Sequence, residues 1–405
     1  TNYTLMDNQK FFLIVAIFLS IFLLWDKWEV THTADANGNI INQTKINNFN
    51  STDNALSDAS NNSDIPDIIV NNNANLGIPH TSIKDQSTYV TVTTDLLTVE
   101  ISHKGGTIQN AWLNDYPIEL GSEKNFQLLS NKANESFSAK SGLYPTTQLP
   151  DESAKYSSEK KAYSLGDKNE LIIPLLWQAN NGIIVTKNYH FKPNSYTIKV
   201  DYTVSNNSGS SIAAGSYTRL SRNSVKSESG MMMQNFTGGA IYINNDERSG
   251  IFEKFDFDDF NDQPKTTSKG GWAAMIQHYF FAAWIPDANI KSDYTSKIEN
   301  GEYVLTTLNP SININPGEKS ILASSQLYVG PKEQFRIDNV APGLDKTVDY
   351  WHLFIIAKPL SELLHWIYSI IGSWGYSIII LTILIKLAFY KLSEKSYRSM
   401  AGMRK

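Results

Sequence analysis

The 405-residue sequence contains no cysteine, which excludes a disulfide framework and any thiolate metal site. It has no excess of positive charge, since 35 lysines and arginines stand against 40 aspartates and glutamates, so we do not expect nucleic acid as a partner. Its seven histidines show no metal-ligand spacing, and we expect no metal or other cofactor. The sequence is instead rich in aromatic residues, with 20 Tyr, 18 Phe and 9 Trp, which suits large β domains and membrane interfaces.

Two stretches resemble ligand-binding loops without matching them. The glycines within 103–107 lack the P-loop pattern and predict a turn between strands. The acidic stretch 252–262, FEKFDFDDFND, lacks the Gly and the terminal Glu of an EF-hand loop. There Phe255 and Phe257 alternate with charged residues, which predicts a strand with one solvated face. No nucleophile and base stand out as a pair, so we expect no catalytic residues and no enzyme activity.

The N-terminal region carries an uncharged apolar run over residues 11–25, followed by tryptophans that suit a membrane interface. We interpret residues 6–30 as a transmembrane helix, an uncleaved signal anchor, and residues 1–5 as extra residues upstream of it. The alternative is a cleaved signal peptide, for which residues 34–36 offer an A-x-A pattern. Charged residues separate that pattern from the apolar run, which favours the anchor.

Residues 31–86 are rich in asparagine and hold little apolar surface, which predicts a disordered tether. From residue 87 onward, apolar residues alternate with polar ones, as they do in half-buried strands. Turn signals at 192–195 and at Pro316-Gly317 separate such strands. Because no helical period interrupts this pattern until about residue 333, we predict a large, mainly β domain over 87–345, an antiparallel sandwich.

After the β domain, residues 346–372 form a predicted interface-helix region. Pro359 suits a first helical turn. Apolar residues and an interface-loving tryptophan then follow at helical spacing: Leu360, Leu363, Leu364, Trp366 and Ile367. This pattern predicts an amphipathic helix lying on the membrane surface, in contact with the lipid bilayer. The alternative is a helix packed on the β domain.

Residues 373–392 have the length and apolar character of a second transmembrane helix. Residues 393–405 are rich in Lys and Arg, so the positive-inside rule places this end in the cytoplasm. With two spans, both termini are then cytoplasmic and the β domain lies outside, which is the periplasm if the cell is Gram-negative.

A single lysine, Lys386, interrupts the second span about 9 Å before its end, at 1.5 Å per residue. Thr382 and Tyr390 lie four residues on either side and share its helical face. A charge with polar neighbours inside a span indicates a functional site that faces a protein interior or a watery cavity. The alternative is a lysine that only extends its amine to the interface.

Several stretches resemble the bacterial members of the YidC/Oxa/Alb family of membrane protein insertases. They are MDNQKFFLIVAI from Met6, SKGGWAAMIQHYFFAAWIP at 268–286, LYVGPKEQ at 327–334, and VAPGLDKTVDYWHLFIIAKPLSELLHWIYSIIGSWGYSIIILTILIK ending at Lys386. The resemblance covers essentially everything outside the Asn-rich tether, in the same order.

The resemblance implies a β-supersandwich like that of sugar mutarotases, without their activity, between two transmembrane helices. It also implies that residues 373–392 are the first of five core helices around a hydrophilic groove with one positive charge. Lys386 stands where the family usually has arginine, and Lys391 stands where proline is common. Lysine keeps the charge but loses the planar fork of donors.

The implied function is the insertion and folding of inner-membrane proteins, with nascent membrane proteins as partners. The Sec translocon and the ribosome are expected to bind the C-terminal part that family members have beyond residue 405. Residues 393–405 match the start of the family's cytoplasmic helical hairpin, so we expect the present chain to be inactive alone.

The alternative function is a membrane-tethered periplasmic carbohydrate-binding module or an epimerase-like protein. An epimerase needs an acid and a base that face one cleft. We predict that no His–carboxylate pair among His103, His190 and His278 lines a shared pocket, and that the β domain binds no common sugar.

Overall fold

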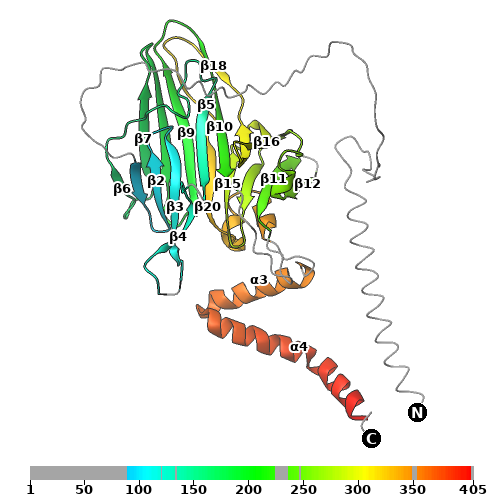
Figure 1. Cartoon of the computed structure of the whole chain (residues 1–405). Helices are drawn as coiled ribbons and strands as arrows, with labels where there is room; N and C mark the ends of the chain where they lie inside the picture. The colour runs from blue at the N-terminus through cyan, green and yellow to red at the C-terminus, as the bar shows by residue number, and fades with distance from the viewer. Residues whose placement is uncertain are drawn as a thin grey trace, which may run out of the picture. The chain divides into compact units, whose positions relative to one another are not determined.

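The computed structural model describes residues 89–402 except residues 120, 133–134, 224–235, 246–247 and 349–353. The described residues divide into two compact units, one within Ser63–Asp349 and one within Tyr350–Lys405 (Figure 1). All described strands belong to the first unit, and the two long helices belong to the second. The predicted extra residues 1–5, the anchor at 6–30 and the tether at 31–86 lie outside the described residues.

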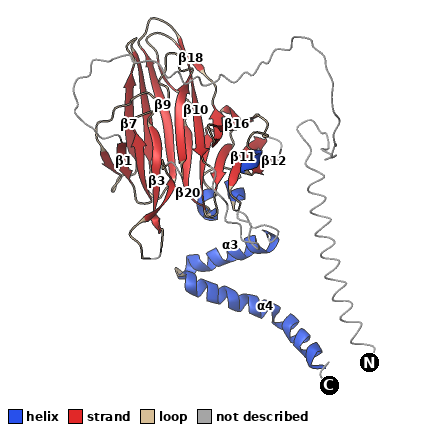
Figure 2. Cartoon of the chain, viewed as in Figure 1, coloured by secondary structure: helices blue, strands red, loops and turns tan. Residues whose placement is uncertain are grey.

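The larger sheet of the β domain has eleven strands (Figure 2). Nine follow one another in the order β13 (Thr266–Lys269), β16 (Lys291–Glu299), β17 (Glu302–Leu308), β10 (Ile212–Arg222), β5 (Phe137–Tyr144), β3 (Thr107–Pro117), β2 (Leu97–Ser102), β1 (Tyr89–Thr93) and β6 (Ala162–Ser164). Beside this path, β18 (Ile312–Ile314) pairs with β10 and β4 (Asn125–Leu129) pairs with β3. Every pairing is antiparallel except that of β1 with β6.

The second sheet has nine strands, all paired antiparallel. Its order is β12 (Arg248–Phe255), β11 (Gly238–Asn245), β14 (Trp272–Ile276), β15 (Phe280–Pro286), β20 (Ser325–Pro331), β9 (Thr197–Asn206), β8 (Ile183–Phe191) and β7 (Leu171–Gln178). The short strand β19 (Lys319–Ile321) pairs with β9 beside this path. The predicted two-sheet, mainly β sandwich is therefore confirmed.

The core lies between the two sheets and draws on both. A single cluster of buried apolar residues includes Val99 and Leu220 from the larger sheet and Val200, Trp272 and Trp284 from the smaller one. The predicted alternation in β9 holds, since Ile198, Val200, Tyr202 and Val204 are all buried. Successive side chains of a strand point to opposite faces of the sheet, so this alternation gives each strand a buried inner face and a polar outer face.

The predicted turns are confirmed, and one predicted strand is shorter than expected. Gly105 and Gly106 take positive φ between β2 and β3, and Gly317 does so between β18 and β19. In the acidic stretch, however, β12 ends at Phe255 and a 3₁₀ turn, η1, follows at Phe257–Asp259. The continuous strand predicted there was wrong, because Phe257 and Phe260 turn back to stack on each other.

Helices follow the last strand: α2 (Gln334–Ile337), the 3₁₀ turn η2 (Leu344–Thr347), α3 (Phe354–Ile371) and α4 (Trp374–Gly402). The prediction that Pro359 lies in the first turn of its helix was wrong, because α3 already includes Phe354, five residues earlier. Proline has no N–H, so this position leaves one carbonyl of the preceding turn without its helical donor.

Candidate functional site

Helices α3 and α4 contact each other around a glycine corner. Gly372 takes a φ of 72°, and its N–H donates to the carbonyl of Tyr368. The rings of Tyr368 and Trp374 stack at 4.0 Å between centroids, which fixes one helix against the other. The corner thus joins the predicted interface helix directly to the predicted span.

The residues predicted to face the membrane surface on α3 are exposed to different extents. Ile367 is buried, whereas Leu360, Leu363 and Leu364 are half-buried. Trp366 is 60% exposed and projects away from this packing. The predicted apolar face therefore belongs partly to intramolecular contacts, which leaves Trp366 as the large aromatic available to an interface.

Helix α4 is the one helix among the described residues that is long and apolar enough to cross a membrane, over Trp374–Lys391. Only 6% of this segment is buried in the chain, so its apolar side chains face outward. Lys386, Thr382 and Tyr390 are all exposed on it. The Thr382 hydroxyl donates to the carbonyl of Ile378, while no hydrogen bond or ion pair of Lys386 occurs within the described part of the chain.

Helix α4 passes Lys391 without interruption and continues to Gly402. The helix therefore extends eleven residues past the lysine that stands in the position where proline is common in the resembled family. Lysine keeps the N–H that a helix interior requires, which proline lacks.

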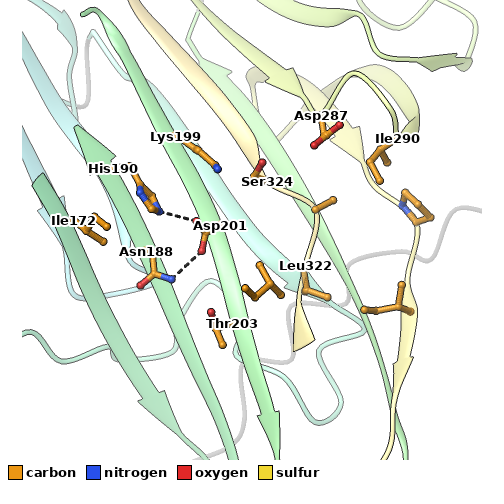
Figure 3. Close-up of a pocket in the computed structure, with 14 residues that line it drawn as sticks. Ile172, Asn188, His190, Lys199, Asp201, Thr203, Asp287, Ile290, Leu322 and Ser324 are labelled. Atoms are coloured by element: carbon orange, nitrogen blue, oxygen red, sulfur yellow. Dashed lines mark hydrogen bonds and ion pairs between the residues drawn. The ribbon is translucent and has the colours of Figure 1, made fainter. Parts of the chain in front are cut away.

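A cavity of about 720 Å³ opens on the outer face of the smaller sheet (Figure 3). Its floor comes from three neighbouring strands, and its wall comes from the segments after β15, after β17 and around β19. The lining residues are Ile172, Asn188, His190, Lys199, Asp201, Thr203, Asp287, Ile290, Pro310, Ile312, Ile321, Leu322, Ala323 and Ser324.

The polar centre of this cavity is Asp201, which is 9% exposed. The amide Nδ2 of Asn188 donates to its Oδ1 at 2.8 Å, and Nε2 of His190 lies 2.7 Å from its Oδ2 (Figure 3). The other ring nitrogen of His190 lies 3.4 Å from a carboxylate oxygen of Glu170. Both oxygens of the Asp201 carboxylate are thus held by protein groups.

This geometry contradicts the prediction that no His–carboxylate pair lines a shared pocket. The prediction was wrong because the antiparallel register of β8 and β9 places Asn188 opposite Asp201 and His190 opposite Lys199. Residues on the same face of paired strands lie within reach of their diagonal neighbours. The alternation of polar and apolar residues in β8, together with the turn at 192–195, was enough to predict this register from the sequence.

The pair does not form the arrangement that an epimerase needs. His190 and Asp201 hydrogen-bond to each other rather than facing a substrate from two sides. The described lining of the cavity also contains no Phe, Tyr or Trp ring on which a sugar could stack. The cavity is therefore a candidate for binding rather than for catalysis.

On the opposite face of β8, Lys187 is fully buried between the sheets. Its Nζ donates to the carbonyls of Ser141 at 2.9 Å and Gly105 at 3.3 Å, and it lies over the rings of Tyr189 and Tyr202. Burial lowers the pKa of Lys187 to about 7, against a smaller raising effect of the Glu152 carboxylate. This lysine is a core residue and not part of the cavity.

Two family models match the chain in sequence. The first, described as the YidC periplasmic domain, matches residues 89–363, and the second, described as 60Kd inner membrane protein, matches residues 366–405. The first covers the β domain and the first part of α3, and the second covers the last six residues of α3, the glycine corner and α4.

Curated relatives agree along nearly the whole chain. The membrane protein insertase YidC of Ruthia magnifica subsp. Calyptogena magnifica is 60% identical over 399 residues, 98% of this chain and 72% of that protein. The YidC of Pseudoalteromonas atlantica is 35% identical over 402 residues, 98% of this chain and 71% of that protein.

Among solved structures, a galactose mutarotase related enzyme from Lactobacillus acidophilus is similar at 12% identity and a TM-score of 0.39, covering 60% of this chain and 97% of that chain. This similarity carries no conclusion about sugar chemistry. The sequence matches decide the assignment, and the chain belongs to the YidC family of membrane protein insertases, inner-membrane proteins with a periplasmic domain, and is not an enzyme.

Proposed function

We propose that Lys386 is the cation of a hydrophilic insertion groove and that α4 is one wall of that groove. The observation that carries this proposal is that the Lys386 amine, within the apolar segment Trp374–Lys391, is exposed and has no partner among the residues that the structure describes. A cation inside a span is costly unless it faces protein, water or an opposite charge. Thr382 and Tyr390 extend the polar stripe one turn in each direction.

In the proposed mechanism, the groove wets the cytoplasmic half of the bilayer and Lys386 attracts acidic residues of a nascent membrane protein. This attraction lowers the cost of carrying the polar segment of the substrate partway across, because the two charges neutralise each other in a medium of low dielectric constant. The apolar helix of the substrate then moves sideways into lipid. No covalent bond is made or broken.

The proposal includes the orientation of the chain. Residues 6–30 and 373–392 would span the inner membrane, residues 346–372 would lie at its periplasmic surface, and both ends would be cytoplasmic. Lysines and arginines after residue 390 support this orientation through the positive-inside rule. Contacts with the Sec translocon and the ribosome are proposed for the part of the relatives that lies beyond the aligned 72%.

The competing role for Lys386 is that of an anchor. It lies five residues before the end of the apolar segment, about 7.5 Å along a helix, and a lysine side chain can cover much of that distance. An anchor needs only a side chain that tolerates the interface, whereas a groove cation needs its positive charge. Substitutions that separate charge from length therefore decide between the two roles.

The test uses the full-length protein in cells depleted of their own insertase, with protease accessibility of single-span substrates as the readout. We expect Lys386→Arg to retain insertion, Lys386→Glu to abolish it, and Lys386→Ala to fall between, with the greatest loss for substrates that have the most acidic translocated segments. Lys395→Glu, in the same helix beyond the span, is the matched control and should insert normally. Equal insertion by Lys386→Glu and the unchanged protein, at equal protein levels, would show that the lysine is only an anchor.

A further inference from the structure

The strand β19 has one edge without a strand partner in the described part of the chain. Strand β9 pairs first with β20 and then, along the same side, with β19. Strand β20 is covered on its other side by β15, but β15 ends at Pro286 and does not reach β19. The result is a notch in the sheet beside residues 319–321, and the cavity of Figure 3 lies at this notch, because Ile321 and Asp287 both line it.

The backbone of Ile321 points into this notch. The N–H of Leu322 donates to the carbonyl of Tyr202, and the carbonyl of Glu318 accepts from the N–H of Asn206. In an antiparallel pair, alternate residues bond to the partner strand, so residues 318, 320 and 322 bond to β9. The N–H and C=O of Ile321 therefore face away from β9. The Ile321 side chain is 71% exposed.

The lining of the cavity divides into two chemical halves. One half is aliphatic and includes Ile172 and Ile312, which are 47% and 43% exposed. The other half presents hydrogen-bonding groups around the Asn188–Asp201–His190 cluster. A smaller cavity of about 200 Å³ shares Asp287 and Ser324 with the first and continues toward Gly271 and Pro342.

We propose that this notch binds an extended polypeptide segment, which adds to β19 as a strand. The segment pairs its backbone with Ile321, places an aliphatic side chain against the isoleucines, and places a short uncharged polar side chain near His190 and Asp201. This mode of recognition takes affinity from main-chain hydrogen bonds and specificity from alternate side chains. The source of the segment, the periplasmic part of a membrane protein before it folds, rests on the proposed function.

The observations favour a polypeptide over a sugar. The unpaired edge of β19 offers one N–H and one C=O at the spacing that the backbone of another strand matches. The hydroxyls of a sugar do not have this spacing. Three exposed isoleucines at the rim gain from burial against aliphatic groups and not against hydroxyls. The charges of the lining are mixed, with Lys199 beside Asp201 and Asp287, so neither a strongly basic nor a strongly acidic segment is favoured.

Binding is tested on the full chain in detergent micelles with a fluorescent, uncharged probe peptide, Ser-Val-Thr-Ile-Ser-Val-Thr, by fluorescence anisotropy. We expect saturable binding that weakens at least about fivefold when proline replaces both valines of the peptide, because a single lost backbone hydrogen bond is worth about 1 kcal/mol. In the protein, Ile321→Pro removes an N–H that no strand uses, and it should weaken binding about as much. Ile321→Ala keeps the backbone and should weaken binding less.

A second measurement locates the site. A photo-crosslinking amino acid in place of Ile312 should capture the peptide, whereas the same replacement of Ile251, which is equally exposed on β12, should not. Loss of the near-UV circular dichroism of the folded β domain in Ile321→Pro would shift the test to this crosslinking pair. Binding that tolerates the prolines, equal crosslinking at both positions, or displacement of the peptide by galactose or maltose would each overturn the proposal. Lys386→Glu should leave peptide binding unchanged, which separates this site from the proposed groove.

Discussion

The β domain buries its large apolar residues, whereas helix α4 exposes them. In the β domain, tryptophans such as Trp272 and Trp284 are buried between two sheets. In α4, almost all of the segment Trp374–Lys391 is exposed, including Ile379 and Phe389. The same side-chain types are hidden in one unit and displayed in the other, which indicates water around the first and lipid around the second.

The two units also treat a lysine in apolar surroundings differently. Lys187 is enclosed, and its amine is satisfied by two backbone carbonyls and two tyrosine rings. Lys386 is displayed on a helix without a partner in the described chain. A buried amine that its own fold satisfies has a structural role, whereas a displayed one in a span is available to another molecule.

The largest expected effect concerns which segments of the chain lie outside the cytoplasm and which lie inside it. We expect protease added to spheroplasts to digest residues 31–86 completely and to leave the tail after residue 392 intact. The physical reason is the positive charge of that tail, which resists transfer across the membrane. An epitope tag at each location, followed by immunoblotting, gives the readout, and lysed spheroplasts are the control. A protected tether would overturn the proposed orientation.

The next effect contrasts a glycine from each unit. Gly271 has a φ of 93°, and an added Cβ would lie 2.3 Å from the carbonyl oxygen of Tyr242. We expect Gly271→Val to cost at least about 3 kcal/mol of folding free energy, since both the backbone conformation and the space exclude a side chain. The measurement is the near-UV circular dichroism of the chain in micelles during thermal unfolding.

The matched glycine is Gly375, which lies in α4. A Cβ added there would have no atom within 4 Å. Gly375→Ala should leave the unfolding of the β domain unchanged and stabilise the helix by at most about 1 kcal/mol. A large loss of β-domain stability in Gly375→Ala would contradict the division of the chain into two separate units.

A further expected effect is a pH dependence of stability carried by Lys187. Its pKa is lowered from 10.5 to about 7, so above pH 7 the folded chain holds a neutral lysine while the unfolded chain still binds a proton. The free energy of unfolding should therefore rise with pH between about 7 and 9, by at most about 1.4 kcal/mol per pH unit, and level off below pH 7.

Lys187→Met should remove this pH slope whatever its effect on absolute stability. Lys192→Met, at an exposed position in the turn after β8, is the control and should retain the slope. Urea unfolding in micelles at pH 7, 8 and 9, followed by the near-UV signal of the β domain, measures both. Equal slopes in the unchanged chain and in Lys187→Met would show that this lysine does not release its proton on folding.

Local periodicity in the sequence determined the elements of this protein. The alternation of Ile198, Val200 and Tyr202 with polar residues predicted a strand and its buried face, since side chains alternate along any strand whatever its neighbours. The long apolar run, broken only by Lys386, predicted a membrane-length helix for an equally local reason. The turns at 192–195 and at Gly317 were also readable, because their conformations are set by the residues within them.

Tertiary structure alone decided which distant residues meet. The hairpin of β8 and β9 brings His190 to Asp201, and that register was readable from the turn, but the cavity wall comes from residues around Ile312 and Ile321, more than a hundred positions later. The open edge of β19 exists only because β15, from another part of the chain, stops at Pro286. Such pairings depend on the packing of both sheets together, and no local period encodes them.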